Sequence, residues 1–387
     1  MADVRVSYVS QKINKVKWRQ SKRQLSQDNQ SFVTGSWDDE QNKVCLWKIN
    51  KDQEAKGMEE EDFGLDEGEP NILCEAPHLG DVTGLENIGD DYIIASSSCG
   101  TVTVYSHHTN SQTLGIVHQW EKLHHHNKRP CPCTCIATQD DTVITAGEDG
   151  RINMLTMGHK GPSRVIEKGD SCTINGITFL GQSQFITVNS SGQLKSFDMR
   201  VNTDEPTQTF QVTGEMTPLQ SVDRHPGQPD IVATGGQDGV LGVWDLRQGK
   251  MPLSLLEAHG STIWEVKFHR TNPDHLFTCS EDGSVWHWDG SHVEQTSAAM
   301  VTAANLTGTG AGSGGGNFTT SQLNFNTSAS VNFSNPWIAT DLAKNKVNVT
   351  TLTDGVMPVN CLDIDGHNLI CGTDGESIIS VNFKFLR

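Results

Sequence analysis

The chain has 387 residues and a formal net charge of −18 at neutral pH. This acidic excess argues against nucleic acid or an anionic membrane as a direct partner, because both are bound through positive surface. No apolar run approaches the roughly 20 residues that span a bilayer. The ten cysteines follow no disulfide spacing, which predicts reduced thiols in the cytosol or the nucleus.

A hairpin pattern recurs along the chain, in which a tight glycine-containing turn joins two short apolar strands. Glycine suits such a turn because it adopts a positive φ without strain. The turn glycines are 50, 42, 47 and 44 residues apart, and they are Gly100, Gly150, Gly192, Gly239 and Gly283. The fifth residue before each glycine is small or carries a hydroxyl: Ala95, Thr145, Thr187, Thr234 and Thr278. The fifth residue after each is large and apolar: Tyr105, Leu155, Phe197, Trp244 and Trp288.

A repeat of this length is typical of WD40 propeller blades. We therefore predict an all-β fold, a seven-bladed WD40 β-propeller that forms a single domain over residues 1–387. Three strands are expected near the carboxyl terminus, at residues 359–364, 368–372 and 377–383. Residues 4–9 alternate between polar and apolar side chains, as a half-buried strand does. They are expected to complete the last blade, which would hide two sheet edges.

The stretch at residues 12–23 carries six basic side chains. It is interpreted as a solvated edge strand followed by a loop. A binding patch or a nuclear import signal is the alternative interpretation of the same stretch.

Two segments interrupt the repeat. Residues 52–70 hold nine acidic residues against one lysine, a composition that buries too little apolar area to fold and predicts a disordered loop. Residues 290–335 are rich in glycine, serine, threonine and asparagine, which predicts a flexible insertion. This insertion accounts for the 92 residues that separate Gly283 from Gly375, the glycine taken as the next turn.

Histidines 124–126 and the cysteines at positions 131, 133 and 135 lie close together in the sequence. Imidazole and thiolate are zinc ligands, but the Cys-x-Cys-x-Cys spacing is shorter than the usual spacer between zinc ligands. We expect these residues to form a loop and the first strand of the third blade, with no bound metal or other cofactor.

The sixth hairpin is the most regular copy of the repeat. His259, Thr278, Asp282 and Trp288 occupy the positions at which WD40 blades hold a buried hydrogen-bond network. A structural role is therefore expected for all four side chains, in preference to a catalytic one. The other blades lack part of this set and are expected to depend on apolar packing.

No phosphate-binding loop, metalloprotease helix, nucleophile elbow or dinucleotide fingerprint is present in the sequence. We therefore expect a non-catalytic protein that binds other proteins through one face of the disc. The candidate contact residues on that face lie beside the turns or at the start of an inner strand, and they are Trp37, Glu148, Gln237, Trp264 and Glu281.

Residues 222–289, with shorter segments at 147–153 and 371–374, resemble the vertebrate forty-three-kilodalton WD-repeat nucleoporins, a family of the Y-shaped nuclear pore scaffold. The resemblance extends from Phe32 to the end of the chain. It implies a structural role in pore assembly, mRNA export, protein transport and kinetochore attachment in mitosis. It also implies a location at the nuclear envelope and a monomeric subunit of a hetero-oligomer, which binds an α-helical scaffold nucleoporin of the short arm.

A second function remains open. Arg200 and Arg247 end consecutive hairpins in the pattern Asp-x-Arg, which resembles the paired signature of WD40 substrate receptors that dock on cullin ubiquitin ligases. Alternatively, each arginine forms an ion pair with the aspartate beside it and has no partner outside the chain.

Overall fold

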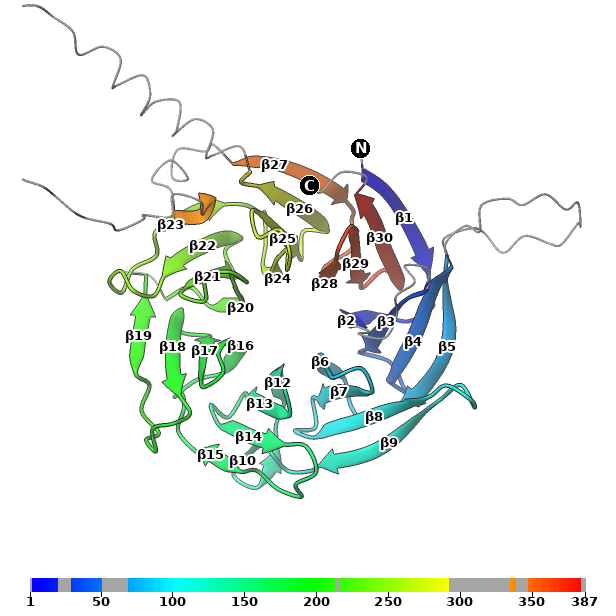
Figure 1. The fold of residues 1–387 in the computed structure, drawn as a ribbon, viewed down its shortest axis with the longest axis horizontal. Coiled ribbons are helices and arrows are strands. Elements are labelled where there is room, and N and C mark those ends of the chain that lie inside the picture. Colours follow the sequence, from blue (N-terminus) through cyan, green and yellow to red (C-terminus); the bar gives the residue numbers. More distant parts are fainter. Residues whose placement is uncertain are drawn as a thin grey trace, which may run out of the picture.

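The computed structural model describes residues 2–19, 29–50, 69–212, 216–291, 335–338 and 347–383. Over these residues it consists of seven four-stranded antiparallel sheets and one two-stranded hairpin. The sheets are arranged as blades around a central axis (Figure 1). The prediction of an all-β propeller with seven blades is confirmed. The predicted acidic loop and flexible insertion lie almost entirely outside the described residues.

Within the first six blades the strands run outward from the axis in chain order, and in the seventh the amino-terminal strand is outermost (Figure 1). The first blade comprises β2 (Ile13–Trp18), β3 (Asn29–Ser36), β4 (Lys43–Asn50) and β5 (Pro70–Pro77). The second comprises β6 (Val82–Ile88), β7 (Tyr92–Ser97), β8 (Val102–His108) and β9 (Thr113–Trp120). The third comprises β12 (Cys133–Gln139), β13 (Thr142–Gly147), β14 (Ile152–Thr156) and β15 (Arg164–Ile166), preceded by the hairpin of β10 (His125–His126) and β11 (Arg129–Pro130).

The remaining blades follow the same plan. The fourth comprises β16 (Ile174–Gly181), β17 (Gln184–Asn189), β18 (Gln193–Asp198) and β19 (Gln208–Gln211). The fifth comprises β20 (Leu219–Arg224), β21 (Ile231–Gly236), β22 (Val240–Asp245) and β23 (Ser254–Glu257). The sixth comprises β24 (Ile263–Phe268), β25 (His275–Ser280), β26 (Ser284–Asp289) and β27 (Asn348–Asp354). The seventh comprises β28 (Val359–Asp365), β29 (Asn368–Thr373) and β30 (Ser377–Phe383).

The amino-terminal strand β1 (Ala2–Tyr8) completes the seventh blade, as predicted. It pairs antiparallel with β30 over its whole length, from Ala2 opposite Phe383 to Tyr8 opposite Ser377. Most side chains of β1 are exposed. The strand is therefore held mainly through its backbone ladder, and it joins the two ends of the chain in one sheet (Figure 1).

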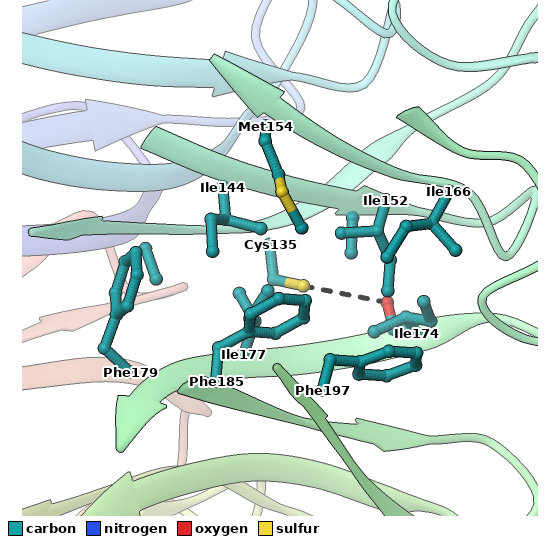
Figure 2. Packing of buried hydrophobic residues seen from close by; sticks show 12 residues of the cluster. Cys135, Ile144, Ile152, Met154, Ile166, Ile174, Ile177, Phe179, Phe185 and Phe197 are labelled. Carbon is teal, nitrogen blue, oxygen red and sulfur yellow. Dashed lines mark hydrogen bonds between the residues drawn. The ribbon is translucent and has the colours of Figure 1, made fainter. Parts of the chain in front are cut away.

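Neighbouring blades pack through buried apolar side chains. Figure 2 shows the contact between the third and fourth blades, where Ile144, Ile152 and Met154 face Phe185 and Phe197. Each blade is too thin to bury both of its faces alone, so the hydrophobic core is a ring of such contacts. The same arrangement explains why one isolated hairpin of this repeat would not be stable.

Every inner strand carries a register shift after its first residue, which is the pattern of a β-bulge. The residues at the seven bulges are Asn14, Thr83, Thr134, Asn175, Gln220, Trp264 and Asn360. Five of them donate a side-chain hydrogen bond to the backbone carbonyl that begins the next inner strand. These bonds connect neighbouring blades at the axis, and the bond from Asn360 to the Ile13 carbonyl (3.0 Å) connects the last blade to the first.

Two interpretations from the sequence were wrong. The basic stretch contains the innermost strand of the first blade, β2, and Lys17 on that strand is buried among charged partners instead of solvated. In the seventh blade, the positive φ of the turn falls on Glu376 (φ 54°) and not on Gly375. The glycine pattern located this turn one residue early, because glutamate takes the left-handed position there.

Candidate interaction face

One face of the disc carries a ring of seven equivalent residues around the mouth of the central channel. In every blade, the residue after the second strand donates its backbone N–H to a carbonyl just before the inner strand, at distances from 2.9 to 3.2 Å. We call these residues the mouth ring: Trp37, Ser98, Glu148, Ser190, Gln237, Glu281 and Asp374. The shared bond fixes the backbone of each position, so the side chains are presented on a rigid frame.

Four of the five predicted contact residues belong to the mouth ring. Glu148, Gln237 and Glu281 are exposed, and Glu281 accepts a hydrogen bond from the Ser261 hydroxyl at 2.7 Å. The fifth, Trp264, lies inside the channel as the bulge residue of β24, and it packs partly against the core of the last blade. Trp264 is therefore not a member of the mouth ring, although it is only two residues from Thr262, whose carbonyl accepts from the Glu281 N–H.

Trp37 is held more firmly than the rest of the ring. Its indole N–H donates to the Asp374 carboxylate at 3.0 Å, which joins two neighbouring members of the ring. Asp374 also accepts from the Asn360 side-chain amide at 2.6 Å. The ammonium of Lys12 lies 6.0 Å from the centroid of the indole ring. This half-exposed tryptophan is therefore pre-organised, with its orientation set by partners on both sides of the junction between the first and last blades.

The channel contains an ion network that the sequence did not reveal. Glu265 on β24 lies 3.3 Å from the Lys15 ammonium on β2 and 3.2 Å from that of Lys267. Lys17 on β2 lies 2.7 Å from Glu86 on β6. Burial alone would lower the pKa of Lys267, but Glu265 and the other carboxylates around it raise this pKa overall. Each charge thus has a partner of opposite sign, which favours a structural role for the network over ligand binding.

The predicted side chains of the sixth blade lie in hydrogen-bond contact. The Thr278 hydroxyl lies 2.7 Å from Nε2 of His259 and accepts from the Trp288 indole N–H at 3.0 Å. The other imidazole nitrogen, Nδ1, lies 2.8 Å from the Ser284 hydroxyl and 3.4 Å from the Asp282 carboxylate. Burial lowers the pKa of His259, with Asp282 acting in the opposite direction. A neutral imidazole that is bonded on both sides supports a structural role.

The third blade holds a second network of this kind, contrary to the expectation of apolar packing alone. Nε2 of His124 lies 2.9 Å from the Thr145 hydroxyl, and its Nδ1 lies 3.0 Å from the Asp149 carboxylate. The Asn153 amide contacts the same imidazole at 3.2 Å. The position of a histidine before the inner strand was the available signal, since His124 and His259 each precede their network threonine by about one strand and loop.

Within the histidine and cysteine cluster, His124 has partners inside the third blade and the three cysteines are buried. His124 faces Thr145 and Asp149, and burial raises the pKa of the Cys135 thiol to about 12. Burial also raises the pKa of Cys133 well above its usual value. Within the described ranges, no group of three histidine, cysteine or acidic side chains is placed to hold a metal ion.

Arg200 and Arg247 follow the third strands of the fourth and fifth blades, on the face opposite the mouth ring. Arg247 forms two bonds of 2.8 Å to the Asp245 carboxylate, and Arg200 bonds Asp198 in the same forked manner. The hydrogen bonds from Arg200 lower the pKa of Asp198. Both arginine side chains are more than half exposed, but each already has a carboxylate of the same chain as its partner.

Comparison with known proteins gives the family. Residues 250–289 match the WD domain, G-beta repeat model. The chain is 42% identical to nucleoporin Nup43 of Mus musculus over 385 residues, which are 98% of both chains. It is 42% identical to nucleoporin Nup43 of Homo sapiens over 392 aligned positions, which cover both chains completely. The chain belongs to the Nup43 family.

Members of the Nup43 family are nucleoporins, so this chain is a component of the nuclear pore complex. A more distant relative, nuclear pore complex protein nup43 of Dictyostelium discoideum, is 26% identical over 44% of this chain. The Nup43 and WD40 relatives point to a non-catalytic structural protein. Among the described residues, no helix is long and apolar enough to cross a membrane.

Proposed function

We propose that this Nup43 family member is a monomeric structural subunit of the Y-shaped scaffold of the nuclear pore, and that it binds an α-helical scaffold nucleoporin of the short arm. The observation that carries the proposal is 42% identity with human Nup43 along the whole chain. The geometry of the mouth ring supports it, since seven fixed positions form a stiff platform for another protein. In this role the chain contributes to pore assembly, mRNA export and protein transport, and to kinetochore attachment in mitosis.

The test is purification of the tagged full-length chain from nuclear-envelope extract after crosslinking, with nucleoporins quantified by mass spectrometry. We expect the scaffold nucleoporins, with a helical member crosslinked directly to the propeller. Recovery without any scaffold nucleoporin would contradict the proposal.

The role of substrate receptor for a ubiquitin ligase is the second candidate, on the observation that Arg200 and Arg247 are both exposed on one face. The pore proposal predicts that the double variant Arg200→Ala and Arg247→Ala recovers nucleoporins as the wild type does. Recovery of a ligase adaptor by the wild type, with its loss in the double variant, would establish the receptor role.

A further inference from the structure

The mouth-ring face is not uniform, because most of its exposed apolar side chains lie where the chain enters or leaves the seventh and first blades. Val356 is 96% exposed, Tyr8 81%, Leu79 63% and Met357 49%. All four lie at the end of an outer strand or in the loop from an outer strand to the next inner strand. Elsewhere on this face, in the described part of the chain, one further large apolar side chain is exposed in such a loop, that of Met216.

Contacts among neighbouring residues connect these positions into one surface. Met357 lies against Gly375, next to Asp374, and Asp374 bonds the Trp37 indole. Beyond Trp37, the backbone N–H of Asp38 donates to the Asp81 carboxylate at 3.0 Å, and Asp81 is two residues from Leu79. The N–H of the residue after Tyr8 donates to the Glu376 carbonyl at 2.8 Å. We call this surface the seam patch, because it covers the closure of the ring.

The seam patch is strongly acidic. Its carboxylates outnumber the ammonium groups of Lys12 and Lys43 beside them, and they are those of Asp38, Asp39, Glu40, Asp81, Asp374 and Glu376. Burial and then the charge of Glu376 raise the pKa of Asp39, although Lys12 and Lys43 act in the opposite direction. Exposed apolar side chains inside an acidic rim are complementary to a segment that carries apolar and basic side chains together.

We propose that the seam patch binds a basic, amphipathic segment of a partner protein, with Trp37 as the central aromatic anchor. This inference rests on the proposed function, for which it names the contact surface and the chemistry of the partner. Trp37 suits the role because tryptophan is the commonest kind of interface anchor, and its partners fix it before binding. A segment bound here crosses from the last blade to the first, so binding also stabilises the closed ring.

Other occupants fit the charge less well. A second copy of the chain would bring the same carboxylates face to face in a two-fold interface. The chain's own acidic segment at residues 52–70 would be repelled in the same way. The basic residues at positions 22, 23, 384 and 387 follow β2 and β30, both of which end on the opposite face.

The experiment compares two tagged full-length proteins with the wild type in nuclear-envelope extract. The first carries Glu40→Lys and Val356→Ser, two exposed positions in the seam patch. The second carries Glu148→Lys, the same charge change on the same face but in the third blade. Equal thermal unfolding curves establish that both variants fold.

We expect the double variant to recover scaffold nucleoporins about tenfold less than the wild type, as loss of a charged and an apolar contact predicts. The Glu148→Lys protein should stay within about twofold. The seam-patch proposal is overturned if the double variant recovers as much scaffold nucleoporin as the wild type. It is also overturned if Glu148→Lys loses as much as the double variant. Absence of nucleoporins from the wild-type sample overturns the proposed function instead.

A second measurement tests the chemistry without the native partner. Two labelled helical peptides of equal length are titrated with the chain, one built from leucine and lysine and the other from leucine and glutamate. The lysine peptide should bind the wild type and lose about tenfold in affinity with the double variant but not with Glu148→Lys. Equal binding of both peptides, or equal loss in both variants, would contradict the assignment.

Discussion

At the scale of single residues, a threonine hydroxyl is the centre of each complete polar network. Thr278 contacts His259 and Trp288, and Thr145 contacts His124, all of them buried. A hydroxyl has one proton to donate and lone pairs to accept, so it can donate to the imidazole and accept from an indole at once. The strand position five residues before the turn therefore has a chemical function that its small size alone would not suggest.

Thr278→Val should lower the free energy of unfolding by about 1–3 kcal/mol, because two buried groups lose their shared partner while the side-chain shape is retained. Urea unfolding measures the change. Thr350→Val, on the exposed outer strand of the same blade, is the matched control and should change stability by less than about 0.5 kcal/mol. An equal effect of the two substitutions would show that the network contributes little.

Buried histidines should make stability depend on pH. Burial and the nearby charge of His275 lower the pKa of His287 to about 4, while an unfolded histidine titrates near 6.5. Between these values the unfolded state binds the proton and the folded state does not. The contribution of this histidine to the free energy of unfolding is therefore fully present above a pH of about 6.5. It falls as the pH decreases toward about 4, by up to about 1.4 kcal/mol per pH unit for each such group.

His287→Gln should reduce the loss of stability between pH 7 and pH 4.5, measured by urea unfolding at both values. The exposed residue His126 provides the control, since His126→Gln leaves a side chain that is in water in both states. If the free energy of unfolding of the His287→Gln protein fell with pH as steeply as that of the wild type, this histidine would be protonated in the folded chain as well.

At the scale of strands, the bulge in each inner strand serves as a connection between blades. A bulge turns one side chain out of the regular alternation, and here that side chain reaches the next blade. Asparagine or threonine occupies five of the seven bulges and forms a bond to the next inner strand. Trp264 occupies the bulge at the junction of the sixth and seventh blades, where an apolar contact takes the place of this bond.

Asn360→Ala should destabilise the chain by about 1–3 kcal/mol, because it removes the bond to the Ile13 carbonyl and a partner of Asp374. It should also speed amide hydrogen exchange in β1 and β2, at the closure of the ring. Asn175→Ala removes the same kind of bond between the fourth and fifth blades. Faster exchange of β1 in the Asn175 variant, or in neither variant, would argue against a specific role of Asn360 in closure.

At the scale of the whole molecule, the ring is closed by a strand whose side chains are largely solvated. Val4 and Val6 on β1 are 39% and 51% exposed, so the apolar burial that β1 contributes is small. Its contribution is the ladder to β30, which covers an edge that would otherwise pair with another chain.

Deletion of residues 2–8 should leave the edge of β30 open and cause concentration-dependent association, detected by light scattering after size-exclusion chromatography. Val6→Ser keeps the backbone ladder and should remain monomeric, with stability within about 0.5 kcal/mol of the wild type. A monomeric deletion variant with unchanged stability would mean that β1 is dispensable for closure.

The hairpin repeat determined the class of fold, the number of blades and the closing strand, because turn glycines and alternating apolar residues are local signals. The same signals located Trp37, Glu148, Gln237 and Glu281 beside their turns, where the structure has them. Local patterns failed at β2 and at the turn of the seventh blade. A buried lysine and a glutamate with positive φ both depend on neighbours that are distant in sequence.

Only the tertiary structure decided which surface is special. Asp374 and Trp37 are 337 residues apart, yet they bond because the ring brings its ends together. Lys15 and Glu265 are separated by 250 residues and meet across the channel for the same reason. Sequence periodicity indicates the strands and turns of each blade. Closure of the ring determines that the first and last blades become neighbours. The seam patch and the channel ion network therefore form only when the ring is closed.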